Sequence, residues 1–155
     1  LTSNTHFSIA VHVLTALSLR DGAPVSSAQL AESVDTNASF LRAVLGRLRR
    51  AGLVDTRRGK GGGATLACPP GDISLLDVYR ATEGRATLQS HDCTACSCPV
   101  ARQMPGVLDR ISDRLDHVVA TELATIHLDE LALKFGEAQR SLERGGPSRT
   151  TRAPW

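Results

Sequence analysis

Aromatic side chains and long apolar runs are scarce in this sequence. Its 155 residues include one Trp, one Tyr and three Phe, so we expect a core built mostly from aliphatic side chains. No run of about 18 apolar residues is present, and we therefore expect no membrane-spanning helix. The first residues also lack the basic stretch and long apolar segment of a signal peptide, which favours a cytoplasmic protein.

Signatures of catalysis are absent as well. The sequence contains no nucleotide-binding loop, no paired catalytic carboxylates and no spacing typical of a nucleophile with its base. Its five His residues are scattered, and each fits a structural or exposed position better than an active site. These absences predict a protein that is not an enzyme.

Positive charge is concentrated in one short region. Residues 40–67 carry seven Lys or Arg and one acid, whereas residues 68–143 carry seven basic and twelve acidic residues. One basic patch on an acidic body is typical of a protein that binds nucleic acid. A solvated charged face is the alternative, but these cations coincide with a helix and a hairpin suited to DNA.

The hairpin is predicted by residues 52–66, which follow an arginine-rich helix. Two short apolar runs, Leu53-Val54 and Ala64-Thr65-Leu66, flank a glycine-rich tip. Glycine permits the positive φ angles that a tight hairpin needs. The tip carries Arg57, Arg58 and Lys60, whose expected partner is phosphate or a narrow minor groove.

A helix-turn-helix is predicted before this hairpin. Apolar residues at helical spacing indicate a first helix over residues 6–20, a short helix capped by Ser26 or Ser27, and a third from Asn37 to about Ala51. The third helix is the expected DNA reader, because small residues and arginines lie on its outer face. Its candidate DNA contacts are Ser39, Arg42, Arg47 and Arg50.

Further helices are predicted beyond the hairpin. Ser74 can cap a helix that ends near Gly84, and Pro99 fits the first turn of another helix. From about Gly106 a long helix is expected to run at least to Leu128, followed by a helix over residues 129–142. From Glu143 the composition predicts a disordered tail.

The long helix carries an apolar stripe that needs a partner. A second copy of the same helix is the economical partner, since two DNA half-sites favour a symmetric dimer. Packing of this helix on its own domain is the alternative. The residues predicted to form the dimer interface are Leu108, Ile111, Leu115, Val118 and Val119.

The predicted fold is therefore mainly α with a small β-hairpin wing. It divides into a winged helix-turn-helix domain (1–84), a cysteine-bearing sensor loop (85–98), dimerisation helices (99–142) and a disordered tail (143–155).

The chain resembles a known family of bacterial winged-helix repressors, which includes IscR, NsrR, RsrR, YwnA and HypR. The resemblance covers about residues 2–132. It rests on these stretches in family order: Phe7-Ser8-Ile9-Ala10-Val11-His12, Ala28-Gln29-Leu30-Ala31-Glu32-Ser33, Ser39-Phe40-Leu41, Leu45-Gly46-Arg47-Leu48-Arg49-Arg50-Ala51-Gly52-Leu53-Val54, Arg58-Gly59-Lys60-Gly61-Gly62-Gly63, Ile73-Ser74-Leu75-Leu76-Asp77-Val78 and Cys98-Pro99-Val100-Ala101-Arg102.

The resemblance implies a homodimer that binds palindromic operators, usually as a repressor. It also implies that Ser39 and Arg42 touch base edges in the major groove. Arg58, with help from Lys60, would then reach the minor groove or the DNA backbone.

Three of the four cysteines form a Cys-x-x-Cys-x-Cys cluster, Cys93, Cys96 and Cys98. In a cytosolic protein such a cluster indicates a metal or redox site rather than a structural disulfide. An iron–sulfur cluster of the two-iron two-sulfur type is one interpretation, because several of the resembling proteins hold a cluster in this loop. In RsrR-like proteins a Glu and a His from the partner complete the site, and those positions correspond to Ser8 and Val34 here.

A thiol switch is the second interpretation of the cysteine cluster. Cys98 directly precedes a predicted helix N-terminus, where the helix dipole favours the reactive thiolate. Zinc held by the three thiolates and His91 is the third interpretation, and a loop without a sensing role is the fourth. Cys68 stands alone near the end of the hairpin and receives no function.

These observations predict a homodimeric transcriptional regulator. We expect a repressor of a palindromic double-stranded DNA operator, controlled by redox or iron–sulfur status. The alternative is a thiol-based redox or metal-binding protein whose winged helix serves protein contact.

Overall fold

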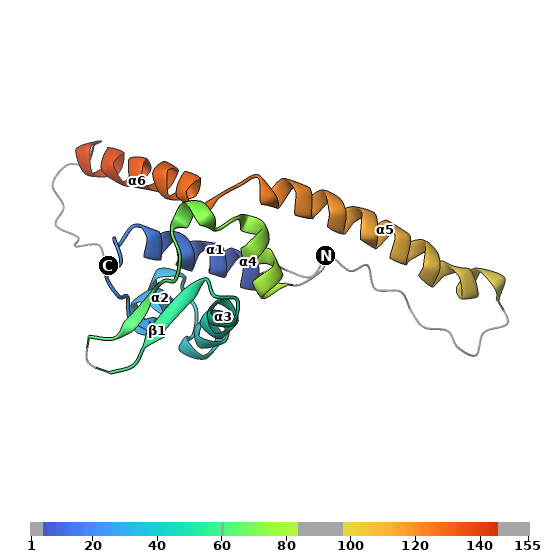
Figure 1. The fold of residues 1–155 in the computed structure, drawn as a ribbon, viewed down its shortest axis with the longest axis horizontal. Helices are drawn as coiled ribbons and strands as arrows, with labels where there is room; N and C mark the ends of the chain where they lie inside the picture. The colour runs from blue at the N-terminus through green and yellow to red at the C-terminus, as the bar shows by residue number, and fades with distance from the viewer. Residues whose placement is uncertain (1–4, 60, 84–97, 146–155) are drawn as a thin grey trace.

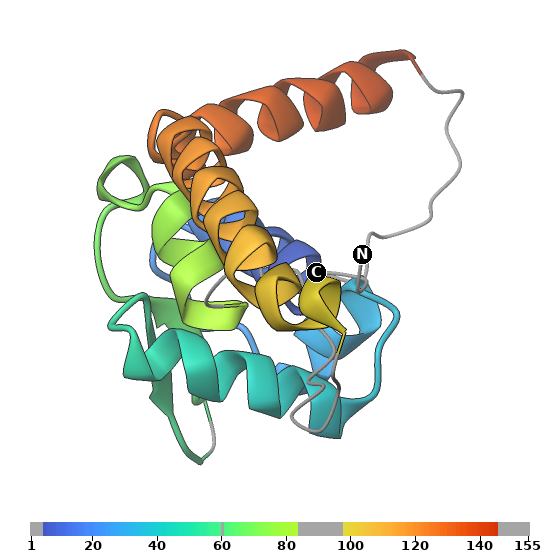
Figure 2. The ribbon, with the colours of Figure 1, turned by 90° about the vertical axis from the view of Figure 1, so that its right-hand side faces the viewer.

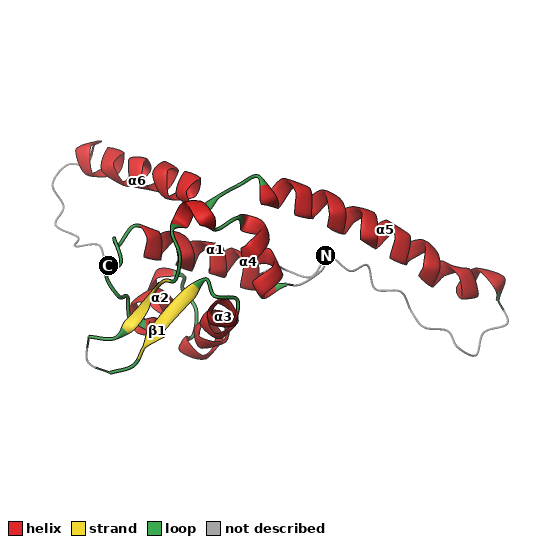
Figure 3. Ribbon diagram, in the orientation of Figure 1, coloured by secondary structure: helices red, strands yellow, loops and turns green. Residues whose placement is uncertain are grey.

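The computed structural model describes residues 5–59, 61–83 and 98–145 (Figure 1). Within these ranges the chain is mainly helical, with one two-stranded hairpin (Figure 3). The elements in order are α1 (Thr5–Ser18), α2 (Ser27–Ser33), α3 (Ala38–Arg50), β1 (Val54–Arg57), β2 (Gly63–Leu66), the short 3-10 helix η1 (Pro70–Asp72), α4 (Leu75–Thr82), α5 (Pro99–Ala124) and α6 (Leu128–Gly145).

Local capping fixes the starts of three helices. The Asn37 side chain accepts a hydrogen bond from the Phe40 backbone N–H at 2.8 Å and caps α3. Ser26 caps α2 and Ser74 caps α4, each through a reciprocal capping box. These contacts satisfy backbone donors that have no partner inside the helix, and they confirm the predicted starts.

The core is aliphatic, as the composition predicts. Leu14 of α1, Leu41 and Leu48 of α3, and Ile73 are fully buried together with Leu128, the first residue of α6. Leu128 donates its backbone N–H to the Ile73 carbonyl at 3.0 Å. The start of α6 therefore belongs to the same core as the helix-turn-helix.

The hairpin is antiparallel and is anchored to the segment before α2. Its register pairs Val54 with Leu66 and Arg57 with Gly63. A further backbone pair joins Val25 to Ala64, with N···O distances of 3.0 and 2.8 Å. This third segment holds the base of the hairpin against the domain.

Three predicted boundaries of the C-terminal helices are wrong. The long helix begins at Pro99 rather than near Gly106, and it continues through Pro105. It also ends at Ala124 rather than at Leu128, because His127 forms a backbone bridge with Ser74 that requires extended chain. The next helix, α6, continues to Gly145, beyond its predicted end at residue 142.

The arrangement of the helices separates two ends of the molecule. In both views the hairpin and α3 lie on one side of the molecule and α6 lies on the other (Figures 1 and 2). The helix α4 packs against α3 and α5, α6 packs against α1, and the N-terminal part of α5 extends beyond the winged domain. None of the helices among the described residues is long and apolar enough to cross a membrane.

Candidate nucleic-acid interface

The helix α3 presents a polar face to solvent. Its inner face buries Leu41, Val44, Leu45 and Leu48, which fix the rotation of the helix in the domain. On its outer face Ser39, Arg42 and Arg50 are exposed. The Arg42 Nη2 donates to the Ser39 hydroxyl at 3.3 Å, so these two side chains lie together in the first turns of the helix. A DNA base edge would meet a hydroxyl and a guanidinium there.

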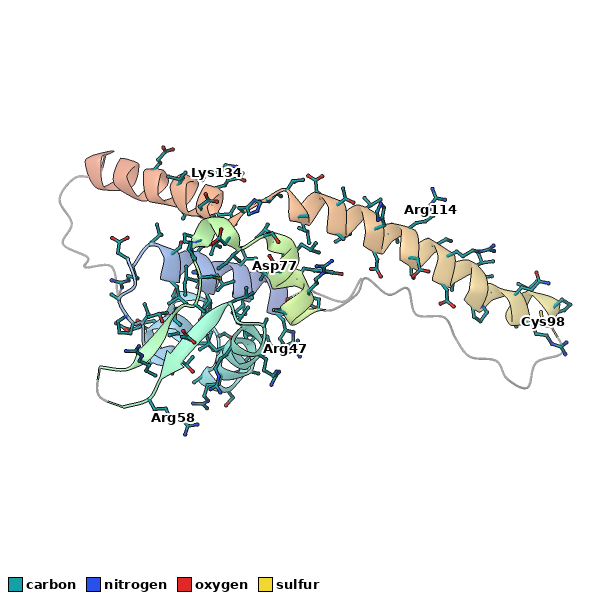
Figure 4. The ribbon with its side chains drawn as sticks, viewed as in Figure 1. Arg47, Arg58, Asp77, Cys98, Arg114 and Lys134 are labelled. Atoms are coloured by element: carbon teal, nitrogen blue, oxygen red, sulfur yellow. The ribbon has the colours of Figure 1, made fainter. Side chains whose placement is uncertain are left out.

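Arg47 is placed differently from the other arginines of α3. It is half-buried, and its guanidinium donates through Nη1 to the backbone carbonyl of Thr82 in α4. The label in Figure 4 marks its position on α3. Arg49, absent from the predicted contacts, is exposed and lies seven residues after Arg42 on the same side of the helix. That spacing was the available signal for Arg49.

The hairpin extends two arginines into solvent. Arg57 and Arg58 are exposed, and Figure 4 shows Arg58 near the tip of the hairpin. The tip turns through Gly59 and Gly61, whose φ angles of 100° and 80° favour glycine. Lys60, the third predicted cation, lies outside the described residues. The exposed arginines of α3 and of the hairpin form a basic surface that can bind the phosphates of DNA.

The apolar stripe of α5 is exposed in the single chain. Ile111 and Leu115 are each 43% exposed and Val118 is 63% exposed, whereas Leu108 and Val119 are half-buried. Val100 and Val107, which are not among the predicted interface residues, are also exposed and fall on the same face at helical spacing.

A different edge of α5 faces its own domain. Ser112 is buried there, and the pKa of Tyr79 in α4 is raised by burial and then by the negative charges of Asp116 and Glu83. The contact between α4 and α5 therefore leaves most of the apolar stripe uncovered.

The cysteine cluster is described only at Cys98. This residue is exposed and directly precedes the first residue of α5, as predicted, at the end of the helix far from the hairpin (Figure 4). Cys93 and Cys96 lie outside the described residues. Within the described part of the chain, no group of three or more His, Cys, Asp or Glu side chains is arranged to hold a metal ion.

Cys68 is a thiol of a different kind. It is half-buried beside the core, and burial, followed by the charges of Asp72 and Asp77, raises the pKa of its thiol. Its thiolate is therefore disfavoured.

A helix-turn-helix followed by a hairpin, with exposed arginines on both, defines the class of winged-helix DNA-binding regulators. The chain belongs to the Rrf2 family, described as iron-dependent transcriptional regulators, and the match covers residues 3–134. This result confirms the predicted family and the prediction that the chain is a transcriptional regulator.

Individual relatives agree with this assignment. YwnA of Bacillus subtilis strain 168, an HTH-type transcriptional regulator, is 32% identical over 129 residues, which cover 83% of this chain and 95% of YwnA. The regulator IscR of Enterobacter sp. strain 638 is 29% identical, over 99% of this chain and 93% of IscR. Among solved structures, CymR, the global cysteine regulator of B. subtilis, has a TM-score of 0.59 at 26% identity, over 86% of this chain and 98% of CymR. These relatives are transcriptional regulators and not enzymes.

Proposed function

We propose that this regulator is a homodimeric repressor that reads a palindromic operator with α3 and the hairpin. The observation that carries the proposal is the position of the exposed arginines. Arg42 and Arg50 on α3 and Arg58 on the hairpin lie on elements at the same side of the molecule (Figure 1). An α-helix fits the major groove of B-DNA, and a cationic hairpin beside it suits the minor groove or the phosphates.

Dimerisation is supported by the exposed stripe of α5. A helix face with Ile111, Leu115 and Val118 open to water is unfavourable for an isolated chain, because apolar side chains gain free energy when they leave water. Two such stripes packed against each other would cover both. A two-fold pair of winged domains then matches two half-sites of inverted sequence, and a bound dimer represses by occupying the promoter.

Control by the cysteine cluster is the second part of the proposal. The ligand set of an RsrR-like iron–sulfur site does not carry over whole to this chain, because Ser8 and Val34 offer neither a carboxylate nor an imidazole at the positions that complete the site in RsrR-like proteins. We therefore assign the control to thiol chemistry, in which Cys98 is the exposed thiol at the start of α5.

The thiol chemistry needs a two-electron oxidant, and a peroxide is suitable. The Cys98 thiolate attacks one peroxide oxygen and forms a sulfenic acid, while the other oxygen leaves as hydroxide. A second thiol, Cys93 or Cys96, then attacks the Cys98 sulfur, so that a disulfide forms and water leaves. The disulfide would change the position of α5, and with it the separation of the two winged domains.

The DNA interface is tested by Arg58→Ala and its salt dependence. Each phosphate contact contributes about −0.9 to the slope of log affinity against log salt concentration, so loss of Arg58 should weaken binding and make that slope shallower by about one. Operator binding would be measured by fluorescence anisotropy over a series of salt concentrations.

The matched control is Lys134→Ala, which removes an exposed cation on α6, away from α3 and the hairpin (Figure 4). It should leave the affinity and the slope unchanged. If Arg58→Ala also leaves both unchanged, the assignment of the hairpin to DNA is wrong. A chain that binds no DNA and associates with a protein partner independently of salt would support the alternative function.

A further inference from the structure

Arg47 joins the DNA-reading helix to the end of α4. Of the arginines in α3, it is the one that is half-buried. Its Nη1 donates to the backbone carbonyl of Thr82, the last residue of α4. The last carbonyls of a helix have no partner inside that helix, and a cation there also complements the helix dipole. Arg47 therefore caps the C-terminus of α4 from a neighbouring helix.

A second set of contacts joins the same two places. Phe40 lies seven residues before Arg47, so both lie on one edge of α3. The His6 ring stacks on Phe40 with a centroid distance of 4.6 Å, and the next residue, Phe7, donates its backbone N–H to the Glu83 carboxylate at 3.1 Å. The end of α4 is thus connected to α3 directly by Arg47 and indirectly through the first turn of α1.

The helix α4 also packs against α5. Tyr79 on α4 is buried and lies close enough to Asp116 of α5 that the negative charge of Asp116 contributes to the raised pKa of Tyr79. The chain of contacts runs from α3 through α4 to α5. The orientation of the reading helix relative to the dimerisation helix therefore depends on how α3 is held against α4.

We propose that Arg47 is a positioning residue, which sets the angle between α3 and α5 and thereby the half-site spacing that the dimer accepts. This inference rests on the proposed homodimer and its palindromic operator. The four buried leucine and valine side chains of α3 hold the helix in the winged domain without Arg47. Loss of Arg47 should therefore leave a single winged domain able to read one half-site, while the geometry of the pair becomes less defined.

The test compares Arg47→Met with the matched control Arg50→Met. Met keeps the apolar stem and the helix propensity but has no donor, and Arg50 is an exposed arginine on the same helix. The probes are a duplex selected from random-sequence DNA with the wild-type chain, the same duplex with one half-site scrambled, and versions with the half-sites one base pair closer or farther apart.

We expect Arg47→Met to bind the selected duplex about tenfold more weakly, in the range typical of coupling between sites. It should discriminate less between the spacings, bind the single half-site within about twofold of wild type, and keep the wild-type salt slope. Arg50→Met should weaken both duplexes and make the slope shallower by about one. Arg47→Lys retains a cationic donor and should restore the spacing preference.

Two results would overturn the inference and leave the proposed function intact. One is a wild-type spacing preference in Arg47→Met, and the other is a salt slope that falls as it does in Arg50→Met, since Arg47 would then contact phosphate. If the wild-type chain itself binds one half-site and the full duplex equally well, the proposal that a dimer binds two half-sites is wrong. The inference about Arg47 is then wrong as well. Circular dichroism checks folding, and Arg47→Leu, which also has no donor, gives the same comparison if the Met variant melts early.

Discussion

Two glycines illustrate opposite constraints at the scale of single residues. A Cβ on Gly63 of β2 would lie 2.6 Å from the Val25 carbonyl oxygen, where the backbone itself must move. A Cβ on Gly46 of α3 would meet no atom within 4 Å. Gly63 thus permits the close approach of the hairpin to the segment before α2. At Gly46, in contrast, there is room for a side chain on the helix.

Substitution of these two glycines by alanine should change the stability of the protein in opposite directions. Gly63→Ala should destabilise the protein by about 1–3 kcal/mol, because the Val25–Ala64 backbone pair must separate. Gly46→Ala should stabilise it by about 0.5–1 kcal/mol, because Ala loses less conformational entropy than Gly in a helix. Thermal and urea unfolding measure both. Equal stability of the two variants would contradict the close approach at Gly63.

Residues whose structure is set by near neighbours could be predicted from the sequence. Ser26, Asn37 and Ser74 cap helices through hydrogen bonds to residues three positions later in the chain. The glycines at the tip of the hairpin likewise predict the turn. The partner of Arg47 could not be predicted, because Thr82 lies 35 residues farther along the chain. Helical spacing predicted Arg47 on the outer, DNA-contacting face of α3, whereas the residue lies at the edge of that outer face.

At the scale of elements, the ends of α5 were also predicted less well from the sequence than the helix itself. The periodic apolar pattern predicted a long helix from about Gly106, but the helix begins at Pro99 and continues through Pro105. Proline fixes φ near the helical value, although inside a helix it removes one backbone hydrogen bond and crowds the preceding turn. The end at Ala124 depends on the bridge between Ser74 and His127, which is a pairing between distant parts of the sequence.

The apolar stripe of α5 gives the prediction at this scale. Ile111→Asp places a charge in the middle of the stripe and should convert the dimer to a monomer, because an unpaired carboxylate would be buried at the interface. The monomer should remain folded, since Ile111 is 43% exposed in the single chain. Analytical ultracentrifugation measures the change.

His117→Asp is the matched control for this variant. His117 is exposed and lies six residues after Ile111, about 120° around the helix and outside the apolar stripe. This variant should remain dimeric. A dimeric Ile111→Asp protein would show that another surface holds the two chains together.

At the scale of the whole molecule, Cys98 at the start of α5 lies far from α3 and the hairpin, so the proposed thiol control requires coupling between these two places. We predict that peroxide lowers the operator affinity of the iron-free wild-type protein by about tenfold, a typical coupling between sites. Cys98→Ser should not respond, because the thiol that reacts first is gone. Cys68→Ser should respond as the wild type does, since burial and the charges of Asp72 and Asp77 raise the pKa of the Cys68 thiol and disfavour its reactive thiolate.

A visible absorption spectrum with iron and sulfide analysis, on protein purified without oxygen, completes this test. A colourless, iron-free protein that loses affinity with peroxide supports the thiol mechanism. A brown protein with equal amounts of iron and acid-labile sulfide would replace the thiol mechanism with a cluster.

The length of α5 has a mechanical consequence for DNA recognition. At about 1.5 Å per residue, its 26 residues span about 39 Å. A small rotation of the helix at one end therefore produces a large displacement of the other end. A tilt of about 5° at one end displaces the other by about 3 Å, which is close to the 3.4 Å rise of one base pair. If the proposed dimer positions its two winged domains through this helix, a one-base-pair change in half-site spacing corresponds to a tilt of only a few degrees. A small local rearrangement would then be enough to change which operator the dimer binds.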